Sequence, residues 1–165
     1  MPDKETMGRV RADKRRGKSA STQAGEFVKE EMDHIREGKH GARSTKQAIA
    51  IGLSKARRAG VPLRAPAKGK ASADTRRNAK SALARGRRAD RPSARRSRAV
   101  LGALEREGHS AASPGALARQ ARQSARKRGP RARSRAAQKA VRTKGSRGRK
   151  AAARKAARTR SRRAA

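Results

Sequence analysis

The chain has 165 residues, and its 49 Lys or Arg against 12 Asp or Glu give a formal net charge of +37. It has no cysteine, one aromatic residue and only 18 large apolar residues, counting Val, Ile, Leu, Met and Phe, which excludes disulfides, cysteine-ligated zinc fingers and RNA-recognition domains with stacking aromatic pairs. Because so little apolar area cannot offset the entropy of ordering the whole chain, the composition predicts a small ordered module and extensive disorder.

Residues 1–21 mix charged residues with Gly and Ser and show no hydrophobic period, so the sequence predicts a flexible N-terminal arm. The arm has no apolar stretch of the kind that a signal peptide needs, and nowhere do about 18 apolar residues follow one another. We therefore expect no membrane association and a cytoplasmic location.

Two amphipathic helices are predicted next, and together they form an αα-hairpin over residues 22–60. The first spans about residues 23–37, with Thr22 as its N-cap and apolar side chains at helical spacing. The second begins after Ser44, because Ser44 and Gln47 have the spacing of a capping box ahead of an apolar stripe. The hairpin is the predicted ordered module of a mainly α fold.

Both helices place large apolar side chains on one stripe, and the simplest interpretation of this stripe is the core of the hairpin. Three small residues of the second helix, Ala48, Gly52 and Ala56, let the helices approach closely. Because the core is thin for so short a module, self-association into a homo-oligomer or docking on a protein partner stays an alternative use of the stripe. The stripe consists of Phe27, Val28, Met32, Ile35, Ile49 and Leu53.

The remainder of the chain is rich in Ala, Lys and Arg. Residues 61–92 also carry Pro and Gly, which predicts a basic linker with at most one short helix. Residues 93–129 carry the start signals of two short, isolated helices, the second opened by Ser113 and Pro114. Residues 130–165 form an Arg/Lys/Ala-rich tail whose closely spaced cations oppose helix formation, so we expect disorder in the free protein.

The positive charge is concentrated in the later part of the chain. Through Gly60 there are 15 basic and 8 acidic residues, whereas residues 61–165 hold 34 basic and 4 acidic residues, and no acid follows Gly108. Cations at this density repel one another unless a polyanion neutralises them, so the sequence points to a phosphate backbone as the partner. Arginine, which dominates the tail, can also contact a phosphate in bidentate fashion.

The candidate phosphate contacts lie in two places. Five belong to the loop of the hairpin and to its second helix, whose N-terminus favours anions, although an ordinary polar turn is the more common use of such a loop. The others lie between Arg119 and Arg163. All candidates together are Lys39, Arg43, Lys46, Arg57, Arg58, Arg119, Arg122, Arg126, Lys127, Arg128, Arg131, Arg133, Arg135, Lys139, Arg142, Lys144, Arg147, Arg149, Lys150, Arg154, Lys155, Arg158, Arg160, Arg162 and Arg163.

No catalytic, cofactor or metal site is predicted. His34 follows Glu30 by four residues, a spacing that metal sites use, but the sequence shows no third ligand nearby, so an exposed pairing is expected. Glu30 and Glu31 are the only adjacent carboxylates, and no pocket is evident in which either could act as an acid or a base. We therefore expect a protein that is not an enzyme.

Three segments of the hairpin region carry a resemblance to a known family. They are STQAGEFV at residues 21–28, HIREGKHGARSTKQAIAIGL at 34–53 and ARRAGV at 56–61. Over about residues 1–63 the chain resembles a bacterial domain-of-unknown-function family of small basic proteins, often labelled DNA-binding. The tail is more loosely similar to bacterial histone H1-like proteins, although it favours Arg where those favour Lys. The resemblance implies a nucleoid-type DNA-binding role and brings no catalytic residues.

The sequence supports two functional hypotheses. The first is a nucleoid-associated, histone H1-like protein that binds duplex DNA without sequence preference through Arg and Lys contacts to phosphates. The alternative is an interaction or dimerisation module, built on the helical hairpin, whose tail binds RNA or ribosomes electrostatically. Phosphate contacts alone do not distinguish DNA from RNA, so RNA stays a close rival within the first hypothesis.

Overall fold

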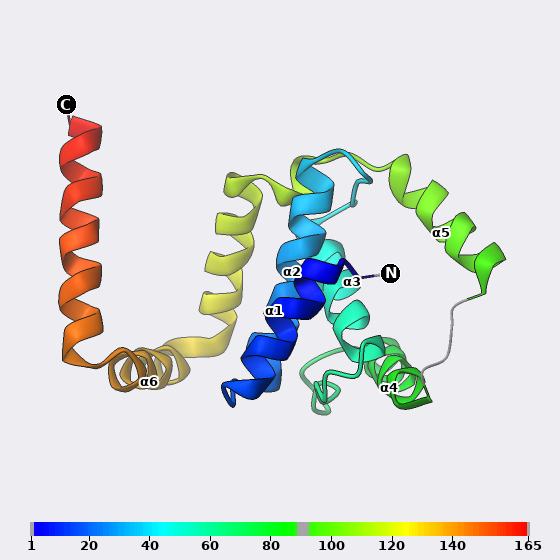
Figure 1. Cartoon of the computed structure of the whole chain (residues 1–165), viewed down its shortest axis with the longest axis horizontal. Coiled ribbons are helices and arrows are strands. Elements are labelled where there is room, and N and C mark those ends of the chain that lie inside the picture. Colours follow the sequence, from blue (N-terminus) through cyan, green and yellow to red (C-terminus); the bar gives the residue numbers. More distant parts are fainter. Residues whose placement is uncertain (1, 89–92, 165) are drawn as a thin grey trace. The chain divides into compact units, whose positions relative to one another are not determined.

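The computed structural model describes residues 2–88 and 93–164, and every regular element in them is helical (Figure 1). The prediction of a mainly α chain is therefore confirmed for these residues, and none of the described helices is long and apolar enough to cross a membrane. The chain divides into two compact units, Met1–Gln120 and Ala121–Ala165. Residues 89–92 of the predicted linker, with Met1 and Ala165, lie outside the described residues.

The elements are α1 (Lys4–Arg15), α2 (Ala20–Arg36), α3 (Thr45–Arg58), α4 (Ala73–Arg88), α5 (Ala94–Glu105), the short 3-10 helix η1 (Ser110–Ala112) and α6 (Pro114–Ala164).

Helices α2 and α3 form the predicted αα-hairpin, and the contact between them is the most extensive one between helices of the first unit. Ser44 caps α3, because its Oγ accepts a hydrogen bond from the backbone N of Gln47 at 3.2 Å, as the capping-box spacing indicates. Gly52 lets the two helix backbones meet, since a Cβ atom at this position would lie 2.7 Å from the Cα of Val28. The small residues of α3 therefore set the distance between the helices.

The apolar stripe of the hairpin lies in the core of this unit, in two clusters of buried side chains. Towards the hairpin loop, Met32 and Ile35 of α2 pack with alanines of α3, of the loop and of η1. In the other cluster, the fully buried Phe27 packs with Val10 of α1 and with Val61, which follows α3. The remaining members of the stripe flank these clusters, Val28 and Ile49 against the first and Leu53 against the second.

Helix α1 occupies most of the segment for which the sequence analysis predicted a flexible arm. It packs against α2, with Val10 buried and with an ion pair of 2.7 Å between Nε of Arg9 and Oε2 of Glu26. The sequence pattern gave no sign of this helix because only Met7 and Val10 contribute large side chains to the core. Packing against α2 supplies the stabilisation that the isolated segment lacks.

Two further boundaries differ from the predicted ones. α2 begins earlier because Ser19, rather than Thr22, is its N-cap, and the Ser19 Oγ accepts a hydrogen bond from the backbone N of Thr22 at 3.3 Å. Within the predicted linker of residues 61–92, α4 is a full helix that contacts α3 and buries Ala79 and Ala82. Alanine faces give little hydrophobic signal, so such a contact becomes visible only in the folded chain.

The segment that follows α5 is attached to the loop of the hairpin. The backbone N of Gly41 donates to the carbonyl oxygen of Leu104 at 2.9 Å, and the backbone N of Ala42 donates to that of Gly108 at 3.0 Å. From the sequence, residues 93–129 were expected to form isolated helices. These two hydrogen bonds show that the connection between α5 and α6 belongs to the first unit.

Helix α6 is interrupted twice. Gly129, where the sequence predicted a helix end, has a φ of 73°, and Gly145 has a φ of 62°, values that favour glycine. Beyond Gly129 the described tail is helical apart from Gly145, which differs from the coil expected for the free tail. Alanine and arginine are both strong helix formers, and the sequence analysis gave more weight to repulsion between cations.

Candidate nucleic-acid interface

The second unit presents an array of exposed positive charge. From Arg122 to Arg162 every lysine and arginine side chain is exposed. Because the sequence holds no Asp or Glu beyond Glu107, no acidic side chain within this unit can pair with them. Arg119, at the end of the first unit, is exposed as well, whereas the side chain of Arg163 lies outside what the structure describes. The other predicted tail contacts are therefore accessible to anions within this unit.

Because α6 is helical, these cations lie in rows along its sides. Arg131, Arg135, Lys139 and Arg142 follow one another at intervals of four, four and three residues, which places them on one side of the helix. A rise of about 1.5 Å per residue separates neighbours in the row by roughly 4.5–6 Å along the helix axis. Such a row can follow a line of phosphates, because duplex DNA carries one negative charge per about 1.7 Å of its axis.

A second row lies beyond Gly145. Arg147, Arg154, Arg158 and Arg162 share one side of the helix by the same spacing rule. The last three line a single shallow hollow on the surface of α6. Several guanidinium groups can therefore approach one stretch of backbone phosphates at the same time.

Four of the five candidates in the hairpin are exposed. Lys39 forms an ion pair of 2.9 Å with Glu37, and the hydrogen bond to this carboxylate raises the pKa of Lys39. Arg43, Lys46 and Arg58 have exposed side chains. These four positions stay candidate phosphate contacts.

Arg57 is buried, which corrects its assignment as a phosphate contact. Its Nε donates to the carbonyl oxygen of Leu63 at 3.1 Å, and its Nη1 donates to that of Leu53 at 3.4 Å. Burial lowers the pKa of the Arg57 guanidinium. The side chain holds the segment after α3 against the helix, so its role is structural.

Three backbone N–H groups of the hairpin loop already have acceptors within the chain. Gly41 donates its backbone N–H group to the carbonyl oxygen of Leu104 in the last turn of α5, and Ala42 donates to that of Gly108 in the segment after it. The backbone N of Arg43 donates to Oε1 of Gln47 at 2.8 Å. These three hydrogen bonds leave fewer backbone donors in the loop for a phosphate, which favours an ordinary polar turn.

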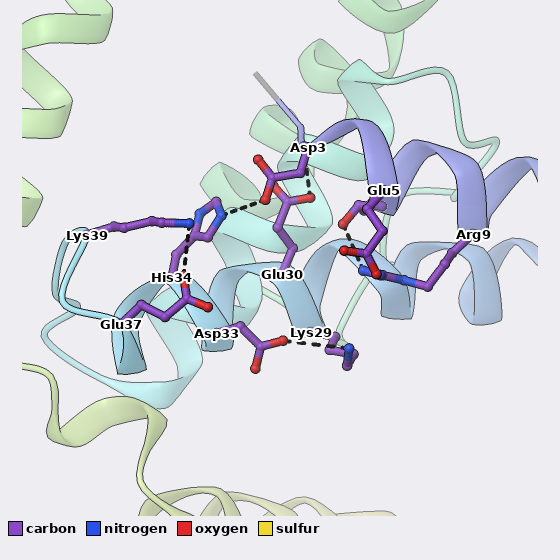
Figure 2. Close-up of a pocket in the computed structure, with 10 residues that line it drawn as sticks. Asp3, Glu5, Arg9, Lys29, Glu30, Asp33, His34, Glu37 and Lys39 are labelled. Atoms are coloured by element: carbon purple, nitrogen blue, oxygen red, sulfur yellow. Dashed lines mark hydrogen bonds and ion pairs between the residues drawn. The ribbon is translucent and has the colours of Figure 1, made fainter.

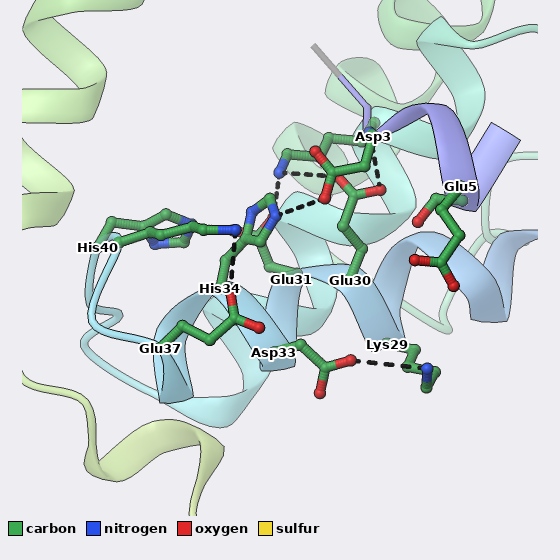
Figure 3. Close-up of polar contacts among 12 residues, drawn as sticks. Asp3, Glu5, Lys29, Glu30, Glu31, Asp33, His34, Glu37 and His40 are labelled. Carbon is green, nitrogen blue, oxygen red and sulfur yellow. Dashed lines mark hydrogen bonds and ion pairs between the residues drawn. The ribbon is translucent and has the colours of Figure 1, made fainter.

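A cluster of ionisable side chains, which the sequence analysis missed, surrounds the C-terminal part of α2. Figure 2 shows His34 turned towards Asp3 beside Glu30, with 3.0 Å between His34 Nε2 and Asp3 Oδ2. Figure 3 adds His40, which lies near Glu31 with 3.3 Å between His40 Nε2 and Glu31 Oε1. The expectation of an exposed His34 without a third group nearby is wrong, because this side chain is 13% exposed and has a second histidine beside it.

Comparison of the chain with family models, with curated proteins and with solved structures finds no match. The resemblance of residues 1–63 to a family of small basic proteins therefore stays an expectation.

Proposed function

We propose that the protein binds nucleic acid without sequence preference, with duplex DNA as its main partner, and that it serves as a histone H1-like, nucleoid-associated protein of the bacterial cytoplasm. The supporting observation is the array of exposed lysine and arginine side chains on helices of the second unit, with no acidic residue among them. Such side chains release condensed counterions when they meet phosphates, and this release drives binding. Contacts to phosphates carry no base information, so binding tolerates any sequence.

The distribution of charge around α6 also favours contact with more than one duplex. Arg133 and Lys144 lie on the side of the helix opposite the row of Arg131, Arg135 and Lys139, as the helical period requires. A helix with cations on both sides can contact phosphates of two duplexes. Bridging and compaction of DNA are the expected consequences.

The second row of α6 provides the test of this proposal. Changing Arg147, Arg154, Arg158 and Arg162 together to Gln removes four cations, whereas changing the same residues to Lys keeps their charge. Since each phosphate contact contributes about 0.9 to the slope of log affinity against log salt concentration, the Gln variant should lose about 3–4 from this slope. The Lys variant should keep it. An unchanged slope in the Gln variant would remove this row from the binding surface.

Competition at one fixed salt concentration distinguishes the possible partners. Labelled duplex DNA bound to the full chain should resist displacement by an equal phosphate concentration of structured RNA. Preferential capture by the RNA would favour the alternative in which the tail serves RNA or ribosomes. The docking version of that alternative has less support, because Phe27 and Ile35 of the hairpin stripe are fully buried within their own chain.

A further inference from the structure

The ionisable cluster around α2 carries an excess of negative charge. Asp3, Glu30 and Glu31 supply three carboxylates, and Lys55 of α3 supplies one ammonium group, 2.6 Å from Oε2 of Glu31 and 3.7 Å from Oε1 of Glu30. Three negative charges and one positive charge leave −2 when the neighbouring histidines are neutral. The cluster is therefore locally negative although the whole chain has a net charge of +37. This local negative charge attracts cations.

Glu31 is the most deeply buried member of the cluster. Its exposed fraction is 0%, and neither of its carboxylate oxygens accepts a hydrogen bond from the described residues. Oε2 has the Lys55 ammonium as its ion-pair partner, whereas Oε1 faces the ring of His40. A buried carboxylate oxygen without a donor is costly, so a cation beside Oε1 would stabilise it.

The neutral ring of His40 cannot serve as a donor to Glu31. His40 Nδ1 lies 3.1 Å from the carbonyl oxygen of Gly41, and because a carbonyl oxygen can only accept, Nδ1 carries the ring proton. The lone pair of Nε2 then faces Oε1 of Glu31 across 3.3 Å. Two acceptors at this distance repel each other unless a proton or a metal cation lies between them.

A hydrogen bond also fixes the ring of His34, but through Nε2 and not through Nδ1 as in His40. The hydrogen bond between His34 Nε2 and Asp3 Oδ2 lowers the pKa of Asp3, so the carboxylate is ionised at neutral pH and Nε2 donates. The lone pair of His34 Nδ1 is therefore left for another partner. The rings of His34 and His40 are perpendicular, with centroids 6.0 Å apart. In protein metal sites, a carboxylate or a backbone carbonyl commonly holds the far nitrogen of each ligand histidine in this manner.

We propose that Glu31, His34 and His40 bind one divalent transition-metal cation of the Zn²⁺ type. One ligand atom from each residue lies within 4.8 Å of the other two. The 3.3 Å between Glu31 Oε1 and His40 Nε2 matches the edge of a tetrahedron with bonds of about 2.0–2.1 Å, and His34 would supply the third ligand. Two imidazoles and one carboxylate suit zinc and leave a position for water. The double charge of the ion also balances the cluster.

A metal ion at this place fixes the loop that follows α2. His40 directly precedes Gly41 and Ala42, whose backbone N–H groups hold the segment after α5. Binding therefore links α2, through the hairpin loop, to the connection between α5 and α6. The role is structural or regulatory, and it goes beyond the phosphate contacts proposed above.

Titration of the full chain with Co²⁺ tests the site, because Co²⁺ substitutes for Zn²⁺ and absorbs visible light strongly in four-coordinate sites. At neutral pH the visible bands should grow up to one equivalent per chain and disappear when Zn²⁺ is added. A spectrum equal to that of Co²⁺ in buffer would overturn the proposal, and this measurement needs no variant.

The three histidines of the chain supply a matched pair of variants. His40→Ala removes one ligand, whereas His109→Ala removes an exposed histidine outside the cluster. Binding of Co²⁺ should weaken at least tenfold in His40→Ala and stay unchanged in His109→Ala, with far-UV circular dichroism as the check on folding. Equal binding by both variants, or equal loss in both, would assign the metal to another place on the chain.

Discussion

Gly52 of α3 meets Val28 of α2 backbone to backbone, since a Cβ atom at position 52 would lie 2.7 Å from the Cα of Val28 and 3.0 Å from the carbonyl oxygen of Phe27. Gly52→Ala is therefore expected to push apart the two helices that carry both core clusters. The free energy of unfolding should fall by about 1–3 kcal/mol, as overpacking of a core does. Denaturant unfolding followed by circular dichroism measures the change.

Gly25→Ala is the matched control for this substitution. Gly25 is exposed on α2, and a Cβ atom there would have nothing within 4 Å. Because alanine is the better helix former, this variant should be as stable as the wild type or more stable by up to about 1 kcal/mol. Equal stability of the two variants would contradict the close contact between α2 and α3.

Arg57 and its neighbour Arg58 should respond differently to substitution by Met. Arg57→Met leaves the carbonyl oxygen of Leu63 without the guanidinium donor, which is expected to lower the free energy of unfolding by about 1–3 kcal/mol. Arg58→Met changes an exposed side chain and should stay within about 0.5 kcal/mol of the wild type. Denaturant unfolding of both variants tests the structural role of Arg57, and greater destabilisation by Arg58→Met would refute it.

The contact between α1 and α2 should weaken in acid. The hydrogen bond with His34 lowers the pKa of Asp3 below its usual 3.8. A lowered pKa in the folded state means that the stabilisation is present above the unfolded pKa and is lost as the pH falls through the folded pKa. The stability difference between wild type and Asp3→Asn should therefore be constant near neutral pH and shrink below about pH 4.

Unfolding curves across this pH range measure the effect, which should be small because the Asp3 side chain is 53% exposed. Asp13→Asn, on the same helix, is the control, since no ion pair of Asp13 occurs among the described residues. A difference that grows towards acid would reverse the predicted sign.

Gly41→Ala should release the segment between α5 and α6. A Cβ atom at Gly41 would overlap the carbonyl oxygen of Glu107, so the hydrogen bond from Gly41 to Leu104 cannot be kept. Cleavage after Glu107 by a glutamate-specific protease should then be faster than in the wild type. Gly102→Ala, within α5, leaves this contact intact and should not accelerate cleavage; equal rates in all three proteins would show that the loop does not hold the segment.

The hairpin could be predicted from sequence because its signals are local. The capping-box spacing from Ser44 to Gln47 and the apolar stripe both lie within one helix length of the residues that they organise. By contrast, α1 and α4 depend on contacts with α2 and α3 and on faces built from few large side chains, such as Met7 and Val10. Such helices need tertiary packing before they become recognisable.

The same distinction holds for the candidate sites. The cationic tail follows from the sequence alone, because no acid beyond Glu107 can neutralise its charges locally. The sequence does not distinguish Arg57 from Arg58, because Arg57 becomes buried only when the chain after α3 folds back over it. Glu31 and His34 share a helix face at a spacing of three, which is a detectable signal, but His40 joins them only through the turn at the end of α2.

The salt dependence of DNA binding tests the central claim most directly. If about eight phosphates are engaged by the exposed cations, the affinity of the full chain for a duplex of arbitrary sequence should fall with a log–log slope near −7. Fluorescence anisotropy at several salt concentrations gives this slope. A slope near −1, or no binding to DNA or RNA at physiological ionic strength, would contradict the account.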